Sequence, residues 1–561
     1  MRELTGAQII LECLLEQGVD TVFGYPGGSV LNIYDALYEY SDQIRHVLTA
    51  HEQGASHAAD GYARASGKTG VVIATSGPGA TNLVTGIATA YMDSVPMVAI
   101  TGNVAQSLLG LDSFQEVDIT GITMPITKHN WIVKDIDDLA PIMREAFRLA
   151  NAGRKGPVLI DIPKDITAAK TAYTPAEPVR DAAGCEASDA ELAAAAKMIA
   201  GSKKPFIYTG GGVILSGAAK EVAAFAEAVD APVASSLMGQ GGFDNRSPRY
   251  IGMLGMHGTK TSSLVSAECD LFVGIGTRFS DRVTCDIKTF LPNAKILQID
   301  IDPAEINKNV KVSQNLIGDV KCVLEKLLPL LKAQKHPAWM AQVAAWQAAY
   351  PLRMAGPTPD AVTPQEVLET LDRLTGGEAI LTTEVGQHQM WAAQFYPFRE
   401  PRQFITSGGL GTMGYGLGAS LGAQVARPDK QVVNVAGDGS FHMNCNELTT
   451  AHKFHIPIIE LLFNNNVLGM VRQWQRLFYG KRFSQTTLDR ETDYEMLAEA
   501  YGVKALTIRE KADIEPVLRE ALAAHEPVLI NCIIDPDINV LPMVPAGGAI
   551  DDPILEIEID D

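Results

Sequence analysis

The stretch from Gln431 to Asn466, QVVNVAGDGSFHMNCNELTTAHKFHIPIIELLFNNN, most constrains what this chain can fold into. It reads as a short β-branched strand, a Gly437–Gly439 turn, a helix and an apolar strand from Ile458 to Phe463. This order predicts two parallel strands whose carboxyl ends meet at one crevice. Asp438 and Asn465 would then lie together, although they are far apart in the sequence.

Two oxygen ligands in this crevice suit Mg²⁺, which takes one or two protein oxygens together with phosphate and water. Glycines beside them let backbone N–H groups approach a phosphate. A lone Gly-Asp-Gly is also a common tight turn. The turn, the helix and the closing Asn-Asn together resemble the thiamine diphosphate motif. The resemblance implies that Asp438, Asn465 and the backbone carbonyl of Val467 hold Mg²⁺.

A second stretch, Gly70 to Ile100, repeats this order of apolar strand, glycine turn, asparagine, helix, proline and apolar strand. Gly77 to Pro96 spans 19 positions, and Gly437 to Pro457 spans 20. Two domains of one topology would follow, which matches the pyrimidine and diphosphate domains that the cofactor bridges in the thiamine family. A chance similarity of two βαβ units is the alternative.

Between these stretches lies a third doubly wound pattern, with strands at 205–208, 271–275 and 297–302 that end in glycine or acid. Its glycine runs do not fit GxGxxG, so nucleotide binding and a purely structural domain both stay open. We therefore predict an α/β protein with three doubly wound parallel-sheet domains. These are a pyrimidine-binding domain (1–170), a central FAD-binding-like domain (188–350) and a diphosphate-binding domain (363–540). A C-terminal tail (541–561) follows them.

Composition supports a globular enzyme of this size. The 561 residues are too many for one core, and the net charge of −20 argues against nucleic acid or an anionic membrane as partner. Seven scattered cysteines without CxxC spacing indicate reduced thiols. With no apolar run of 18 residues and no leader pattern at the N-terminus, we expect a cytoplasmic protein.

Three further segments, DSFQE (112–116), ITKHN (126–130) and GPVLIDIPKD (156–165), point to a narrower family. They resemble the catalytic subunit of acetohydroxyacid synthase (acetolactate synthase), and the likeness runs from Leu4 to Gly548. It implies decarboxylation of pyruvate on thiamine diphosphate and transfer of the hydroxyethyl unit to pyruvate or 2-ketobutyrate. This is the first common step of valine and isoleucine biosynthesis. FAD would be bound in a structural role.

The resemblance also assigns residues. Glu52, in a helix's first turn, would otherwise be a dipole or capping residue, but in this family it contacts the aminopyrimidine and drives its tautomerisation. Arg282 would bind the acceptor carboxylate, and Gln115 and Lys164 complete the catalytic set. Gly28, Phe114, Met470 and Trp474 would form the substrate pocket. The thiamine diphosphate set is Glu52, Val385, Gly386, Gln387, His388, Gly411, Met413, Gly437, Asp438, Gly439, Ser440, Asn465, Gly469 and Met470, and the FAD set is Gly211, Met238, His257, Arg278, Asp300 and Asp319.

Other functions remain open at this stage. A flavin-dependent pyruvate oxidase shares the domain order, a simple pyruvate decarboxylase comes third, and a nucleotide-binding regulatory protein is the non-enzymatic alternative. Val467, Ala105 and Ser107 depart from residues common in the family, and the latter two leave inhibitor sensitivity open. A homodimer or homotetramer is expected, because the cofactor joins domains of different chains in this family. A small regulatory subunit, valine inhibition and the acceptor preference are not decided.

Overall fold

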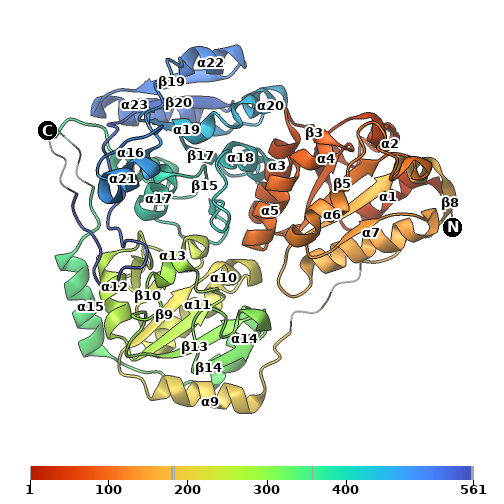
Figure 1. Ribbon diagram of the computed structural model, residues 1–561. Coiled ribbons are helices and arrows are strands. Elements are labelled where there is room, and N and C mark those ends of the chain that lie inside the picture. The colour runs from red at the N-terminus through yellow and green to blue at the C-terminus, as the bar shows by residue number, and fades with distance from the viewer. Residues whose placement is uncertain (1, 179–180, 182–183, 355, 357, 558–561) are drawn as a thin grey trace.

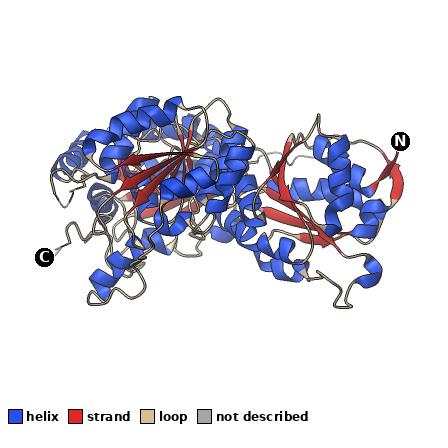
Figure 2. Ribbon diagram, turned by 90° about the horizontal axis from the view of Figure 1, so that it is seen from above, coloured by secondary structure: helices blue, strands red, loops and turns tan. Residues whose placement is uncertain are grey.

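The structure, a computed structural model, describes residues 2–178, 181, 184–354, 356 and 358–557. It contains three six-stranded sheets, each with helices on both faces (Figures 1 and 2). Every strand pair within these sheets is parallel. The predicted α/β class with three doubly wound domains is confirmed.

The N-terminal sheet has the order β3-β2-β4-β5-β7-β6. Its strands are β2 (Thr21–Tyr25), β3 (Arg45–Leu48), β4 (Gly70–Ala74), β5 (Met97–Asn103), β6 (Asn130–Ile132) and β7 (Pro157–Pro163). Its helices are α1 (Gly6–Glu16), α2 (Leu31–Glu39), α3 (Glu52–Ser66), α4 (Pro78–Asn82), α5 (Val84–Asp93), α6 (Ile119–Thr123), α7 (Ile136–Asn151) and α8 (Lys164–Ala168). A separate antiparallel pair joins β1 (Arg2–Thr5) to β8 (Lys170–Tyr173), so the chain stays with this unit through Tyr173.

The C-terminal sheet has the order β16-β15-β17-β18-β20-β19. Its strands are β15 (Ile380–Thr383), β16 (Phe404–Ile405), β17 (Val432–Gly437), β18 (Ile459–Asn464), β19 (Lys504–Ile508) and β20 (Val528–Ile533). Its helices are α16 (Pro364–Thr375), α17 (Gln387–Phe395), α18 (Gly416–Ala426), α19 (Asp438–Phe441), α20 (Leu448–Lys453), α21 (Gly469–Phe478), α22 (Tyr494–Ala500) and α23 (Lys511–Ala523). Counted from its own first strand, each of these two sheets has the order 2-1-3-4-6-5, so the predicted repeat is confirmed.

The central sheet differs, because its order β11-β10-β9-β12-β13-β14 corresponds to 3-2-1-4-5-6, the order of dinucleotide-binding folds. Its strands are β9 (Pro205–Thr209), β10 (Val233–Ser235), β11 (Tyr250–Met253), β12 (Leu271–Ile275), β13 (Lys295–Asp300) and β14 (Gln314–Ile317). Its helices are α9 (Asp189–Ala200), α10 (Gly211–Ser216), α11 (Ala219–Val229), α12 (Lys260–Glu268), α13 (Asp281–Thr284) and α14 (Val320–Leu327), and α15 (Pro337–Ala349) leads toward the next unit.

Alternate residues of each strand enter different cores, as period-two geometry requires. In β4, Val71 and Ile73 pack on one face of the sheet, and Val72 and Ala74 pack on the other. This explains why the strands read as continuous apolar runs in the sequence, since a parallel sheet covered on both sides has no solvent-facing positions.

The helix predicted inside the opening stretch, between the glycine turn and the apolar strand, is present in the structure. A 3-10 turn at Cys445–Glu447 leads directly into α20, which ends at Lys453. A further short helical turn, α19, begins directly at Asp438. Between α19 and the 3-10 turn, the buried Asn444 side chain donates to the Gly414 carbonyl at 2.6 Å.

The N- and C-terminal units pack through α3 and α18, which lie side by side in Figure 1. A Cβ on Gly61 would lie 2.1 Å from the Ala419 carbonyl oxygen, and one on Gly422 would lie 1.8 Å from that of Ala58. The two helices therefore approach backbone to backbone, which only glycine permits at these positions.

Met543 pairs with Ile554, so the segment after the C-terminal sheet folds back on itself. We expect the acidic tail, Asp551 to Asp561, to be solvated, and its last residues, 558–561, lie outside the described residues. None of the helices in the described part is long and apolar enough to cross a membrane.

Candidate functional site

The two loops of the opening stretch lie next to each other. Gly437, the last residue of β17, pairs with Phe463 on β18. Asp438 follows and is only 2% exposed, and its Oδ2 has no hydrogen-bond partner. Burial raises the pKa of the Asp438 carboxyl to about 7. Asn465 accepts the Val467 N–H through Oδ1 at 3.2 Å. A buried carboxylate oxygen without a donor fits a hard cation.

Two side chains from the start of α17 converge on the same place. A Cβ on Gly437 would lie 2.5 Å from His388 Nδ1, and one on Gly469 would lie 2.0 Å from Gln387 Oε1. His388 Nε2 and Gln387 Oε1 are both buried without a partner. Burial lowers the pKa of His388 to about 3, so the ring is neutral. The Gln387 amide nitrogen already donates to two acceptors, so Gln387 presents an oxygen here.

These donors suit Mg²⁺ better than a transition metal. In the part of the chain that the structure describes, no group of three or more His, Cys, Asp or Glu side chains could hold a metal. The predicted ligand set instead has one carboxylate, one amide oxygen and one backbone carbonyl, which leaves positions for phosphate and water. Its members lie on adjacent loops, but their role as ligands stays a prediction.

The glycine turn itself is held by a buried acid. Ser440 donates through its hydroxyl to Glu384 Oε2 at 2.7 Å and accepts the Gly414 N–H at 3.0 Å. Glu384 also accepts the Leu417 N–H at 3.0 Å. A Cβ on Gly439 would lie 2.5 Å from a methyl carbon of Leu468, so the Leu468 side chain packs closely over this turn.

A cavity of about 920 Å³ opens between all three units. The N-terminal unit contributes residues 92–94 and 153–155 to its wall. All six residues predicted for FAD line it, namely Gly211, Met238, His257, Arg278, Asp300 and Asp319. It is also lined by the predicted substrate or thiamine diphosphate residues Arg282, Val385, Gly386, Gly411, Met470 and Trp474.

Arg282 and Trp474 reach this cavity from different units and contact each other. The Arg282 guanidinium carbon lies 5.6 Å from the centroid of the Trp474 ring, a cation–π distance. The nearest carboxylate to Arg282 among the described residues is Asp281, at 4.0 Å. Trp474 Nε1 is buried without an acceptor. The pair thus offers a cation and an N–H donor to a ligand.

The central unit supplies mixed polar groups to the cavity. Burial raises the pKa of Asp300 to about 6 and lowers that of His257 to about 4. The Nδ1 atom of His257 is buried without a partner. Asp319 caps α14 by accepting the N–H groups of Lys321 and Cys322. These groups could bind the polar parts of a nucleotide, while Met238 adds an apolar surface.

The remaining predicted residues lie apart from the cavity. Gly28, Glu52, Phe114, Gln115 and Lys164 all belong to the N-terminal unit, and none of them lines it. Glu52 starts α3, is 9% exposed and accepts Asn82 Nδ2 at 2.9 Å. Gln115 lies over Gly77, whose Cβ would be 2.8 Å from its carbonyl oxygen. Phe114 is 88% exposed. The predicted diphosphate and metal residues Gln387, His388, Met413, Gly437, Asp438, Gly439, Ser440, Asn465, Val467 and Gly469 do not line the cavity either.

Comparison with known proteins agrees with this geometry. Residues 4–122, 192–327 and 384–532 match the N-terminal TPP binding, central and C-terminal TPP binding domains of thiamine pyrophosphate enzymes. The chain is 46% identical to a probable acetolactate synthase large subunit of Methanocaldococcus jannaschii, covering 99% of this chain and 96% of that one. It is 44% identical to the acetolactate synthase large subunit of Haemophilus influenzae, covering 99% of each.

This chain belongs to the acetolactate synthase family of thiamine pyrophosphate enzymes. An acetolactate synthase of Mycobacterium leprae is also 46% identical, over 98% of this chain and 90% of that one. The relatives favour acetolactate synthase over the pyruvate oxidase alternative.

In this member of the acetolactate synthase family, a residue that the sequence did not single out anchors the start of α3. Glu447 accepts the backbone N–H of Ala50 at 3.1 Å and that of His51 at 3.0 Å, and Thr450 donates to it at 2.6 Å. A Cβ on Gly54 would lie 2.0 Å from Glu447 Oε1. The C-terminal unit thus fixes the backbone next to Glu52.

Sequence reasoning also missed other residues. Arg154 and Lys155 line the cavity, and Asn82 contacts Glu52. The sequence pattern could have identified Asn82, because the repeat places an asparagine after its glycine turn. No sequence pattern could have identified Glu447, since a lone glutamate before a helix is most simply a surface residue.

We expect Glu447→Gln to loosen the entry to α3. An amide has one acceptor oxygen in place of two, so it sets an N–H group against a backbone N–H and leaves a donor unsatisfied, which costs about 1–3 kcal/mol. Hydrogen–deuterium exchange of the peptide spanning residues 49–54 should become faster. Thr450→Val is the matched control, because it removes a hydrogen bond to Glu447 but keeps both acceptors for the backbone. Unchanged exchange in Glu447→Gln would refute the anchoring role.

Proposed function

We propose that the chain is the catalytic subunit of an acetolactate synthase, which decarboxylates pyruvate and joins the two-carbon unit to a second 2-keto acid. The observation that carries this is the contact between Arg282 and Trp474 at 5.6 Å in a cavity that also contains the glycine loop at Gly411. A guanidinium with only a distant carboxylate neighbour suits a keto-acid carboxylate. The acetolactate synthase relatives point to the same reaction.

Thiamine diphosphate, when bound, supplies a nucleophilic carbon and an electron sink for decarboxylation. The residues that would hold it lie at the ends of β17 and β18 and at the start of α17. Glu52 would hold a proton at N1′ of the aminopyrimidine. Arg282 would orient the acceptor by its carboxylate. Met470 and Trp474 would exclude water from the reacting atoms.

Mg²⁺ and FAD belong to the same proposal. Asp438, Asn465 and the Val467 carbonyl would hold Mg²⁺, which the unpartnered Asp438 Oδ2 supports. The six cavity residues of the central unit would hold FAD, which the strand order 3-2-1-4-5-6 supports. The flavin would be structural, because the proposed reaction transfers no net electrons.

The active site would be completed by a second copy of this chain. Glu52 and Gln115 do not line the cavity. Several large apolar side chains of the same unit are exposed, among them Phe114 at 88%, Met124 at 69% and Leu111 at 66%. Exposed apolar groups of this kind mark interaction surfaces. A homodimer or homotetramer follows, and a cytoplasmic location stays a prediction.

A smaller regulatory subunit is a further proposed partner. Two of the relatives are named as large subunits, which implies a small subunit for those proteins.

The reaction is tested by incubating the protein with pyruvate, Mg²⁺ and thiamine diphosphate, with and without FAD. Acetolactate should form, measured as acetoin after acid treatment, without stoichiometric oxygen uptake at an electrode. Peroxide without acetolactate would move the protein to the oxidase class and remove the acceptor role of Arg282.

Arg282→Lys should lower kcat/KM for the acceptor keto acid by roughly 10- to 100-fold, since a lysine loses the bidentate, charge-assisted contact. Initial rates at varied pyruvate and 2-ketobutyrate measure this. Arg509→Lys, which changes an exposed arginine that does not line the cavity, should leave the rates unchanged. An equal effect of both variants would contradict the role.

Complementation tests the shared site. Glu52→Gln and Asp438→Asn chains should each be inactive alone. A heterodimer purified through two different tags should have about half of the wild-type activity, because one of its two symmetric sites receives both intact residues. If each site were built within one chain, both sites of the heterodimer would be defective, and it would be inactive.

A further inference from the structure

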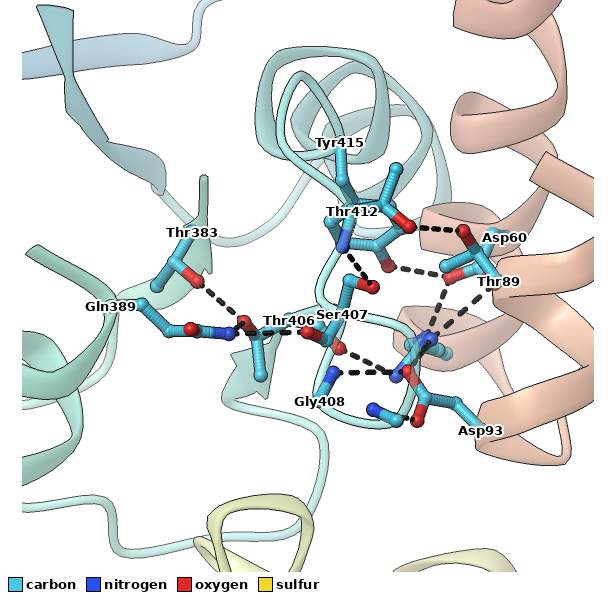
Figure 3. A network of polar contacts seen from close by, with 12 residues as sticks. Asp60, Thr89, Asp93, Thr383, Gln389, Thr406, Ser407, Gly408, Thr412 and Tyr415 are labelled. Carbon is cyan, nitrogen blue, oxygen red and sulfur yellow. Dashed lines mark hydrogen bonds and ion pairs between the residues drawn. The ribbon is translucent and has the colours of Figure 1, made fainter. Parts of the chain in front are cut away.

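A network of buried polar contacts, in which Asp60 and Asp93 lie close to Thr406 and Gly408, links the N-terminal unit to the glycine loop of the C-terminal unit (Figure 3). Arg64, on α3, donates through Nε to Asp60 at 2.6 Å and through Nη2 to Asp93 at 3.0 Å. Its Nη1 donates to the Thr406 carbonyl at 2.9 Å. The Arg64 side chain is 10% exposed, and both carboxylates are fully buried. The Tyr415 hydroxyl also donates to Asp60.

Asp93, which binds Arg64, also binds the glycine loop, here defined as Ser407–Gly414. Its Oδ1 accepts the Gly409 N–H at 2.7 Å, and its Oδ2 accepts the Gly408 N–H at 3.2 Å. A Cβ on Gly409 would lie 2.6 Å from Asp93 Oδ1. The carboxylate therefore lies directly against the loop backbone, between Arg64 and two N–H groups.

The loop is held at its other points by neutral groups. Thr412 shares a 2.7 Å hydroxyl hydrogen bond with Thr89, and its N–H donates to Ser407 Oγ at 3.0 Å. Gln389 donates to the Ser407 carbonyl at 3.2 Å. Gly411 lies between these contacts, with φ of +70°, and nothing would lie within 4 Å of a Cβ there. Gly411 is thus free to face the cavity that it lines.

We propose that Arg64 and Asp93 are positioning residues that fix the Ser407–Gly414 loop for cofactor binding. The inference rests on the proposed function, in which Gly411 and Met413 contact thiamine diphosphate. A network that served only to join the units would need no contact with the loop backbone. This one places charge-assisted hydrogen bonds on the consecutive N–H groups of Gly408 and Gly409, three and two residues before Gly411.

Helix α3 carries both the proposed catalytic glutamate and the arginine that supports the glycine loop. Glu52 is the first residue of α3, and Arg64 lies near its end. A shift of α3 would therefore move the catalytic glutamate of one half-site and the support of the loop in the other. Such a rigid element is what precise positioning needs.

The experiment compares wild type with Asp93→Asn, which keeps the size of the side chain but removes the charge and one acceptor. Exchange of the peptide spanning residues 406–414 should become about tenfold faster in cofactor-free protein. The Kd for thiamine diphosphate with Mg²⁺, measured by quenching of tryptophan fluorescence, should rise about tenfold. The kcat at saturating cofactor should also fall, because the loop no longer holds a single conformation.

Asp230→Asn is the matched control, because it breaks a comparable Arg–Asp pair, with Arg249 at 2.8 Å, in the central unit. It should change neither the exchange of the loop nor the Kd. Equal exchange and Kd in wild type and Asp93→Asn would overturn the inference, and so would equal effects of both variants. Thr412→Val, which removes the hydroxyl contact with Thr89, should act on the loop in the same direction and serves if Asp93→Asn does not fold.

The two proposals fail separately. Exchange is measured without cofactor, so a protein that binds thiamine diphosphate but forms no acetolactate would refute the proposed function and leave the loop inference standing. A protein that forms acetolactate but whose loop is insensitive to Asp93→Asn would refute only the inference.

Discussion

The backbone contact between α3 and α18 is the constraint on which the rest of the site depends. Gly61 and Gly422 let the helices approach until a Cβ on either would lie about 2 Å from a carbonyl oxygen of the other helix. At this separation Arg64 reaches the Thr406 carbonyl, and Glu447 reaches the start of α3. Larger residues would separate the two units and break both contacts, because overpacking moves backbone rather than filling space.

Buried carboxylate side chains fix the loops around the site by accepting hydrogen bonds from the loop backbone. Glycine loops expose N–H groups that no helix or sheet satisfies, and a buried N–H without an acceptor is costly. Three carboxylates supply acceptors. Asp93 binds the loop before Gly411, Glu384 binds the turn that follows it, and Glu447 binds the backbone before Glu52. Because a buried charge is stable only where its partners are in place, each acid favours one loop conformation.

The sequence predicted the features that depend on residues close together in the chain. The apolar runs and glycine turns predicted the three sheets and the repeat, because strand period and turn chemistry act over a few residues. The proximity of the loops that begin at Asp438 and Asn465 also followed, since β17 and β18 are adjacent parallel strands that end at one edge. Arg64 and Asp93 were not predictable, because the contact that joins them to Thr406 exists only after two units have packed. The separation of Glu52 from the cavity is likewise a property of the packed chain.

The glycines of the loop show why a composition-based interpretation is incomplete. A Cβ on Gly408 would lie 2.3 Å from the sulfur of Met238 in the central unit, and a Cβ on Gly409 would lie 2.6 Å from Asp93 Oδ1. Gly411 is required by its own backbone, at φ of +70°. A different feature of the structure thus disfavours a side chain at each of these glycine positions. Backbone freedom that would make an isolated segment flexible is removed here by three units at once, so the loop is best understood as a fixed wall shared by the proposed flavin and thiamine sites.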